Sequence, residues 1–208
     1  NNSGPFNVVD AFPDPANPGD VFFSNYTFNP SYGVYKMKYN SSSKDFEFVK
    51  RYTMGSDSGY GRRPVGFTAD DQNNIFSTLA FSGPGSGLAF YDRATDDFLV
   101  KDLNTSTGIQ YPVFNSDLLW IPIPRSANFL VYDTKKTATF SDDTQYYLDQ
   151  TNNIPANTVS FTMDKSGDAW IGTELGLRIP PNAASEAKND PQLQAIVIEQ
   201  NGLAEELF

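Results

Sequence analysis

The residue types that carry most enzyme chemistry are missing from this chain. Its 208 residues include neither histidine nor cysteine. Without histidine there is no Ser-His-Asp triad and no side chain that ordinarily titrates near neutral pH. Without either residue an ordinary zinc site, thiol catalysis and iron–sulfur ligation are excluded. Catalysis would have to rely on carboxylates, tyrosine, lysine and arginine.

Carboxylates are plentiful, with 25 Asp and Glu residues in total. A glycosidase needs only two of them, about 5–10 Å apart, so a carboxylate-dependent glycosidase or lyase stays open as a third interpretation. Most aspartates, however, stand in turn-like segments, where Asp usually accepts hydrogen bonds from nearby backbone. These are Asp70-Asp71, Asp96-Asp97, Asp142-Asp143, Asp164 and Asp168. We therefore predict no enzyme, no catalytic residues and no cofactor.

Calcium is a second interpretation of the segment Asp164–Asp168, because closely spaced carboxylates and carbonyls suit that ion. The segment lacks the alternating ligands and the terminal Glu of an EF-hand loop. A structural turn is favoured, and we predict no metal site.

A small group of loop residues is the best candidate for a ligand-binding site. Arg62 and Arg63 follow Tyr60, and Arg125 lies in the Pro122–Ser126 turn. Guanidinium groups of this kind can hold a carboxylate or a phosphate through paired hydrogen bonds. The alternative is that they are ordinary solvated loop arginines.

The formal net charge of −10 opposes binding to nucleic acid or to an anionic lipid surface. No apolar run approaches the 18 residues that a membrane-spanning helix requires. The first residues, Asn1–Pro5, lack the basic and apolar regions of a signal peptide. We expect either a removed signal or a fragment of a longer protein, and favour the fragment.

The elements that would position these residues are clearest in Thr158–Arg178. Val159, Phe161 and Met163 alternate with polar residues, which predicts a half-buried strand. A turn rich in Asp and Gly follows, and Ala169–Thr173 then predicts a second strand. A lone hairpin is marginal in water, so this one must belong to a larger sheet.

The same unit recurs along the chain with a large aromatic residue on its second strand. Phe22, Phe76, Trp120 and Trp170 occupy this position, at successive spacings of 54, 44 and 50 residues. A period in this range indicates propeller blades or another repeat array. We predict that these four residues, with Gly172, form the repeat core between neighbouring sheets. The alternative for the two tryptophans is a platform for stacking sugars.

Third and fourth strands follow each aromatic strand, which predicts an all-β fold of four antiparallel, four-stranded propeller blades in a single domain, 1–208, that forms part of a larger ring. The expected blades are approximately 6–53, 62–104, 109–150 and 156–200. The expected fourth strands are Phe46–Arg51, Phe98–Asp102, a part of Thr139–Leu148, and Leu193–Glu199. Helical turns are expected only at Asn182–Asn189 and Leu203–Leu207. Open blade edges would allow self-association.

The run Val159–Arg178 resembles the two-component-regulator propeller repeat of Bacteroidetes, whose pattern is D-x-x-G-x-x-W-I-G-T followed by x-x-G-L. The matching residues are Asp164, Gly167, Trp170, Ile171, Gly172, Thr173, Gly176 and Leu177. Two families use this repeat: the surface propeller protein of the type IX (Por) secretion system, and the periplasmic sensor region of hybrid two-component histidine kinases. The segment Ile198–Phe208 and the insertion Pro181–Pro191 resemble the former more.

This resemblance implies an exported protein of a Gram-negative bacterium, in the periplasm or on the outer surface. The first expectation is a non-catalytic binding or scaffold module that acts in maturation or anchoring of secreted proteins. The alternative is a sensor domain that binds an oligosaccharide. The implied partners are a protein, or a glycan such as lipopolysaccharide.

Overall fold

The computed structural model describes residues 7–26, 32–54, 62–79, 86–103, 109, 111–115, 117–123, 129–137, 139–155, 158–180, 188–189, 191–200 and 203–206. These residues form four antiparallel sheets of four strands each and one two-stranded hairpin. The predicted all-β fold of four antiparallel, four-stranded blades is confirmed. The chain divides into two compact units, Asn1–Pro112 and Val113–Phe208, and we describe each by itself.

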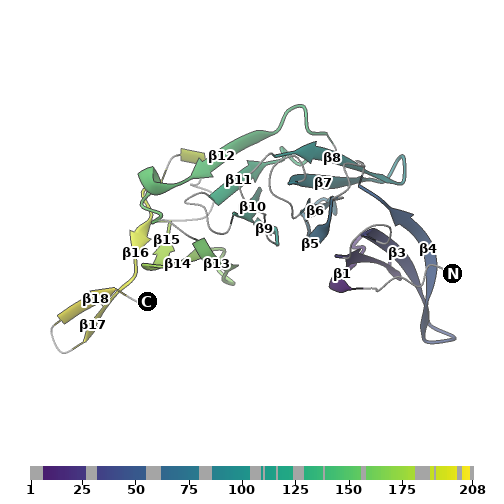
Figure 1. Ribbon diagram of the computed structural model, residues 1–208, viewed down its shortest axis with the longest axis horizontal. Helices are drawn as coiled ribbons and strands as arrows, with labels where there is room; N and C mark the ends of the chain where they lie inside the picture. Colours follow the sequence, from purple (N-terminus) through teal and green to yellow (C-terminus); the bar gives the residue numbers. More distant parts are fainter. Residues whose placement is uncertain are drawn as a thin grey trace. The chain divides into compact units, whose positions relative to one another are not determined.

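The first unit contains two sheets, each with its strands side by side in chain order (Figure 1). The first sheet consists of β1 (Val8–Pro13), β2 (Asp20–Asn25), β3 (Gly33–Asn40) and β4 (Asp45–Tyr52). The second consists of β5 (Pro64–Ala69), β6 (Ile75–Leu79), β7 (Gly87–Asp92) and β8 (Asp97–Asp102).

Aromatic rings fill the core between these two sheets. Phe22 of β2 is fully buried, and its ring centroid lies 4.9 Å from that of Tyr91 and 6.3 Å from that of Phe67. Tyr52 of β4 and Phe98 of β8 complete the cluster, 5.2 Å apart. Edge-to-face aromatic pairs of this kind add about 0.5–1.5 kcal/mol each beyond their buried area.

The second unit repeats this arrangement. Its first sheet consists of β9 (Val113–Asn115), β10 (Leu118–Pro122), β11 (Phe129–Asp133) and β12 (Thr144–Leu148), followed by the short 3₁₀ helix η2 (Gln150–Asn152). Its second sheet consists of β13 (Thr158–Met163), β14 (Ala169–Thr173), β15 (Gly176–Ile179) and β16 (Gln194–Ala195). Trp120, Phe129 and Ile171 belong to the hydrophobic cluster between the two sheets.

The end of the described chain differs from the expectation. The predicted strand Leu193–Glu199 is divided: only β16 pairs with β15, while β17 (Val197–Gln200) pairs with β18 (Leu203–Glu206) in a separate hairpin. The predicted helical turn at Leu203–Leu207 is therefore wrong. Asn201-Gly202, a dipeptide typical of two-residue hairpin turns, connects the two strands. Of the helical turn expected within Asn182–Asn189, only residues 188 and 189 are described.

Candidate binding surface

The side chain of Trp170 is held in place by the turn that precedes its strand. Asp164 accepts hydrogen bonds from the backbone N–H groups of Ser166, at 2.8 Å, and Asp168, at 3.0 Å. Its second oxygen accepts from the indole Nε1 of Trp170 at 3.0 Å. The indole hydrogen bond, followed by those from the backbone, holds the pKa of the Asp164 carboxyl below its ordinary value. The turn interpretation of Asp164 thus acquires a second role, which is to orient the indole.

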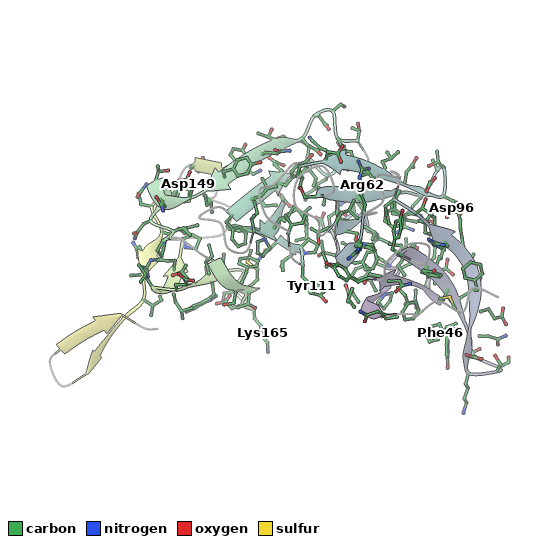
Figure 2. The ribbon with its side chains drawn as sticks, viewed as in Figure 1. Phe46, Arg62, Asp96, Tyr111, Asp149 and Lys165 are labelled. Atoms are coloured by element: carbon green, nitrogen blue, oxygen red, sulfur yellow. The ribbon has the colours of Figure 1, made fainter. Side chains whose placement is uncertain are left out.

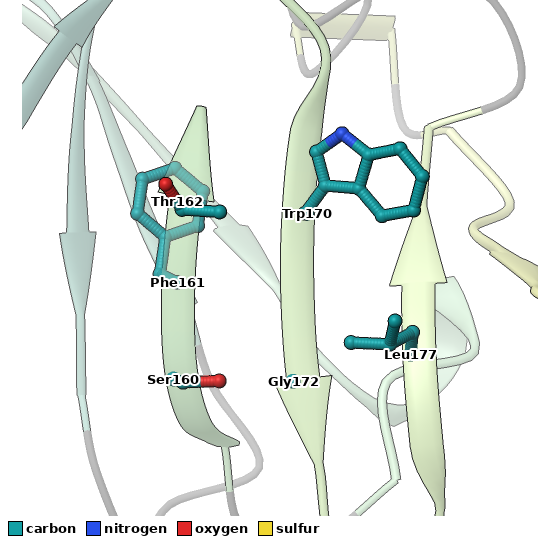
Figure 3. A pocket seen from close by; sticks show the side chains of 6 residues that line it. All are labelled: Ser160, Phe161, Thr162, Trp170, Gly172 and Leu177. Atoms are coloured by element: carbon teal, nitrogen blue, oxygen red, sulfur yellow. The ribbon is translucent and has the colours of Figure 1, made fainter. Parts of the chain in front are cut away.

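Trp170 borders a shallow hollow of about 230 Å³ on one face of the sheet β13–β16 (Figure 3). The hollow is also lined by Ser160, Thr162, Gly172 and Leu177, which lie on neighbouring strands. Gly172 has room for no side chain, because a Cβ atom there would lie 2.1 Å from Ser160 Oγ. We call these five residues the Trp170 face. It offers one aromatic ring, one aliphatic side chain and two hydroxyl groups.

The equivalent aromatic residues of two other sheets are buried against a neighbouring sheet. Trp120 has no exposed surface, and its indole stacks on Phe161 of the next sheet at 5.6 Å and 16°. Phe22 is buried against Phe67 and Tyr91. Both therefore lie in the inter-sheet core, as their repeat position suggests.

Trp170 differs from these core residues, although the sequence assigned it to the same set. It is only half-buried and lies outside the hydrophobic cluster that includes its neighbours Ala169 and Ile171. The reason is that Ala169 and Ile171 point toward β9–β12, whereas Trp170 points to the opposite side. Within the described part of the second unit, no sheet packs on that side. Phe76, the remaining member of the set, is 2% exposed and lies 5.6 Å from Phe90.

The arginine site expected from the sequence is only partly described. Arg62 forms an ion pair with Asp102 and donates to the carbonyl oxygen of Met54 at 3.3 Å (Figure 2). Arg63 is 4% exposed, and its guanidinium lies 5.1 Å from the centroid of the Tyr26 ring. Both side chains contact other residues of the first unit. Tyr60 and Arg125 lie outside the described residues, so a ligand at this site stays a prediction.

Sequence reasoning missed a polar cluster between β1–β4 and β5–β8, centred on Asp96 (Figure 2). One oxygen of Asp96 accepts from the hydroxyl groups of Tyr91, at 2.6 Å, and Tyr52, at 2.8 Å. Lys36 and Lys50 form ion pairs with the same carboxylate. No signal in the sequence indicates this cluster, because its members are spread over 61 residues.

The cluster does not suit acid catalysis. Burial opposes ionisation of Asp96, but hydrogen bonds from Tyr91, Tyr52 and Lys50 outweigh it and hold the pKa of the carboxyl below its ordinary value. Every aspartate with a resolved shift among the described residues has a lowered pKa. A glycosidase acid requires a raised one. Among the residues that the structure describes, no cluster of acidic side chains could hold a metal ion, and no helix is long and apolar enough to cross a membrane.

Four-stranded antiparallel sheets joined in chain order, with aromatic residues packed between them, define a β-propeller module. The structure is similar to that of PorZ, an essential surface component of the type IX secretion system of Porphyromonas gingivalis. The TM-score is 0.73 at 17% identity, over 99% of this chain and 29% of that one. It is also similar to the extracellular domain of the hybrid two-component system BT4673 from B. thetaiotaomicron. There the TM-score is 0.61 at 17% identity, over 99% of this chain and 25% of that one.

These two structures are of the kinds that the sequence repeat resembles, and at this identity they establish the fold. The chain spans less than a third of the length of either protein. A protein proposed to be a 6-phosphogluconolactonase, from Bacteroides uniformis, is also similar, with a TM-score of 0.51 at 10% identity over 95% of this chain and 55% of that one. The fold is therefore shared by surface proteins and by a protein assigned to an enzyme class. No protein-family model and no curated protein sequence matches the chain.

Proposed function

We propose that the chain is a non-catalytic binding module of an exported β-propeller protein, acting in the periplasm or at the outer surface. One observation carries the proposal. Trp170 is half-exposed on its sheet, whereas Phe22 and Trp120, at the same repeat position, are buried against another sheet. A partly exposed aromatic residue with a fixed orientation is typical of protein-binding hot spots. The likeness to PorZ and to the BT4673 extracellular domain supports the compartment and the scaffold role.

The partner that we favour is a protein, as expected for a scaffold that takes part in maturation or anchoring of secreted proteins. The test replaces Trp170 by a photo-crosslinking amino acid in the exported protein. The matched control carries the same amino acid at Leu99, which is 41% exposed in the first unit. We expect covalent protein adducts at position 170 that are absent at position 99. Equal crosslinking at both positions would refute a binding role for the Trp170 face.

An oligosaccharide is the second candidate, because the hydroxyl groups of Ser160 and Thr162 lie beside the indole. Sugar rings stack on aromatic faces and hydrogen-bond to such groups. Titration with lipopolysaccharide-derived oligosaccharides, followed by tryptophan fluorescence, tests this candidate. A saturable change that is lost in Trp170→Phe would favour the sensor-like function, and no change at millimolar sugar would exclude it.

A further inference from the structure

A second exposed apolar surface lies on the sheet β1–β4, on the opposite side from Phe22. It is built by aromatic side chains of β2, β3 and β4, and we call it the aromatic face. Its rings contact one another, with centroids 5.4–6.3 Å apart. Its members are Phe23, Tyr35, Tyr39, Phe46 and Phe48.

The exposure of the aromatic face is unusual for side chains of this kind. Phe48 is 61% exposed, and Tyr39 and Phe46 are each 42% exposed. Single exposed apolar residues are normal on a protein surface, but a contiguous group of aromatic rings marks an interaction site. Phe46, labelled in Figure 2, lies on the β3–β4 hairpin at the centre of this group.

Sheets inside each unit pack by one rule, which identifies what these two faces fit. The side of a sheet that bears Phe22 or Trp120 packs on the side of the next sheet that bears Phe67 or Phe161. Register shows that the Trp170 face is of the first type, because Thr162 pairs with Trp170 as Phe12 pairs with Phe22.

The aromatic face is of the second type. Phe67 pairs across its sheet with Ser77 and then Ala89. The corresponding row in the first sheet is Ala11, Phe23 and Tyr35, since Tyr35 and Ala89 each stand two residues after the glycine that begins the third strand. Where Phe67 and Phe161 carry large rings, this row begins with Ala11. The smaller side chain leaves room for an indole.

We propose that the Trp170 face of one copy of this chain packs on the aromatic face of a second copy. The contact reproduces between molecules the sheet-on-sheet packing seen within each unit. The proposal rests on the binding role proposed above and names the partner as the chain itself.

Two physical consequences follow from this arrangement. The two faces are different surfaces, so the contact is heterologous and extends into chains of copies unless the rotation between copies closes a ring. Each copy has a formal net charge of −10, so copies repel one another at low ionic strength. Added salt screens this repulsion over about 10 Å at 0.1 M and therefore promotes association.

The test is a complementation experiment on the purified full chain, with mass measured by sedimentation velocity. Trp170→Lys blocks one face and Phe48→Lys blocks the other. We expect each variant alone to be monomeric at concentrations where the unaltered chain forms a ladder of oligomers. An equimolar mixture of the two should give a discrete dimer, because each variant retains the face that the other lacks. Leu175→Lys, at a site 55% exposed on the β14–β15 turn, is the matched control and should associate as the unaltered chain does.

Three outcomes overturn the proposal. They are an unaltered chain that stays monomeric at high concentration and salt, a Phe48→Lys variant that still associates, and a mixture that gives no dimer. The second would indicate a symmetric contact through the Trp170 face alone. None of them bears on the binding role itself, because the crosslinking test detects any other protein that contacts position 170. Circular dichroism of each variant verifies that the lysine has not unfolded the sheet.

Discussion

The indole of Trp120 stacks on the ring of Phe161, with 5.6 Å between centroids and 16° between planes. Trp120 lies on β10 and Phe161 on β13, so the pair joins the two sheets of the second unit. Phe129 packs against both rings, at 5.6 Å and 4.7 Å. This three-ring contact shows what the repeat position of Trp120 does when a neighbouring sheet is present. Trp170 occupies the same position without such a neighbour.

The first prediction compares these two tryptophans by their effect on stability. Trp120→Ala should lower the free energy of unfolding by about 3–5 kcal/mol, because it leaves a large cavity in a fully buried site. Trp170→Ala removes a half-buried ring beside an open hollow and should cost about 1 kcal/mol. Urea unfolding at neutral pH measures both values. Equal losses would mean that Trp170 is also a core residue.

The second prediction concerns the ion pair between Asp14 and Arg93. The Asp14 side chain is fully buried and receives two hydrogen bonds from Arg93, at 2.7 Å and 2.8 Å. Burial raises its pKa, but the hydrogen bonds from Arg93, Asn17 and Ala16 outweigh this, so the pKa lies below the model value of 3.8. Arg93→Met leaves a buried carboxylate without its cation. Since Arg93 is 33% exposed, the expected loss at pH 7 is about 2 kcal/mol, below the range for fully buried pairs.

The pH dependence of that loss follows from the sign of the shift. A carboxyl group with a lowered pKa in the folded state stabilises the protein above its unfolded pKa, and this contribution is lost as pH falls through the folded pKa. The difference in urea midpoint between the unaltered chain and Arg93→Met should therefore be constant from pH 7 to 5 and shrink below pH 3.8. Lys38→Met, which removes an exposed cation, should show no such change. A constant difference down to pH 2 would contradict the pairing.

How much the sequence predicts depends on whether the signal is local. The hairpin Thr158–Thr173 was predictable because alternation, an Asp-Gly turn and a closing aromatic strand all occur within 16 residues. The divided strand after Leu193 was not, because short segments without periodicity do not distinguish a strand from a helical turn. Asn201-Gly202 was the signal that could have predicted the final hairpin.

The candidate surface was harder to predict for the same reason. The repeat places Trp170 on a strand and on one side of it, but its exposure depends on whether another sheet packs there. The Asp96 cluster joins Lys36, Tyr52 and Tyr91 across two sheets, and no spacing in the sequence brings these residues together. Such sites follow from how sheets pack, which local patterns do not specify.

The third prediction tests a close backbone approach at Gly33, where β3 begins. Its φ angle is +128°, and a Cβ atom there would lie 2.2 Å from the carbonyl oxygen of Tyr52. Gly19, with a φ angle of +96° and its nearest atom at 3.8 Å, is the matched control. Both alanine variants incur the backbone strain of a positive φ angle, about 1–2 kcal/mol. Gly33→Ala should cost about 2 kcal/mol more, because the carbonyl must also move, and thermal unfolding should separate the two. Similar melting temperatures would show that β3 and β4 adjust without loss.

The fourth prediction uses the fact that the chain has only two tryptophans. Trp120 is completely buried, so the fluorescence of Trp170→Phe, which reports Trp120 alone, should be blue-shifted and should resist acrylamide quenching. Trp120→Phe leaves only the half-exposed Trp170, whose emission should lie at longer wavelength and be quenched several-fold more strongly. If copies associate through the Trp170 face, this quenching should fall as protein concentration and salt are raised, while that of Trp170→Phe stays constant. Equal quenching of the two variants in dilute solution would show that Trp170 is covered even in the single copy, and the Trp170 face would then be unavailable to any partner.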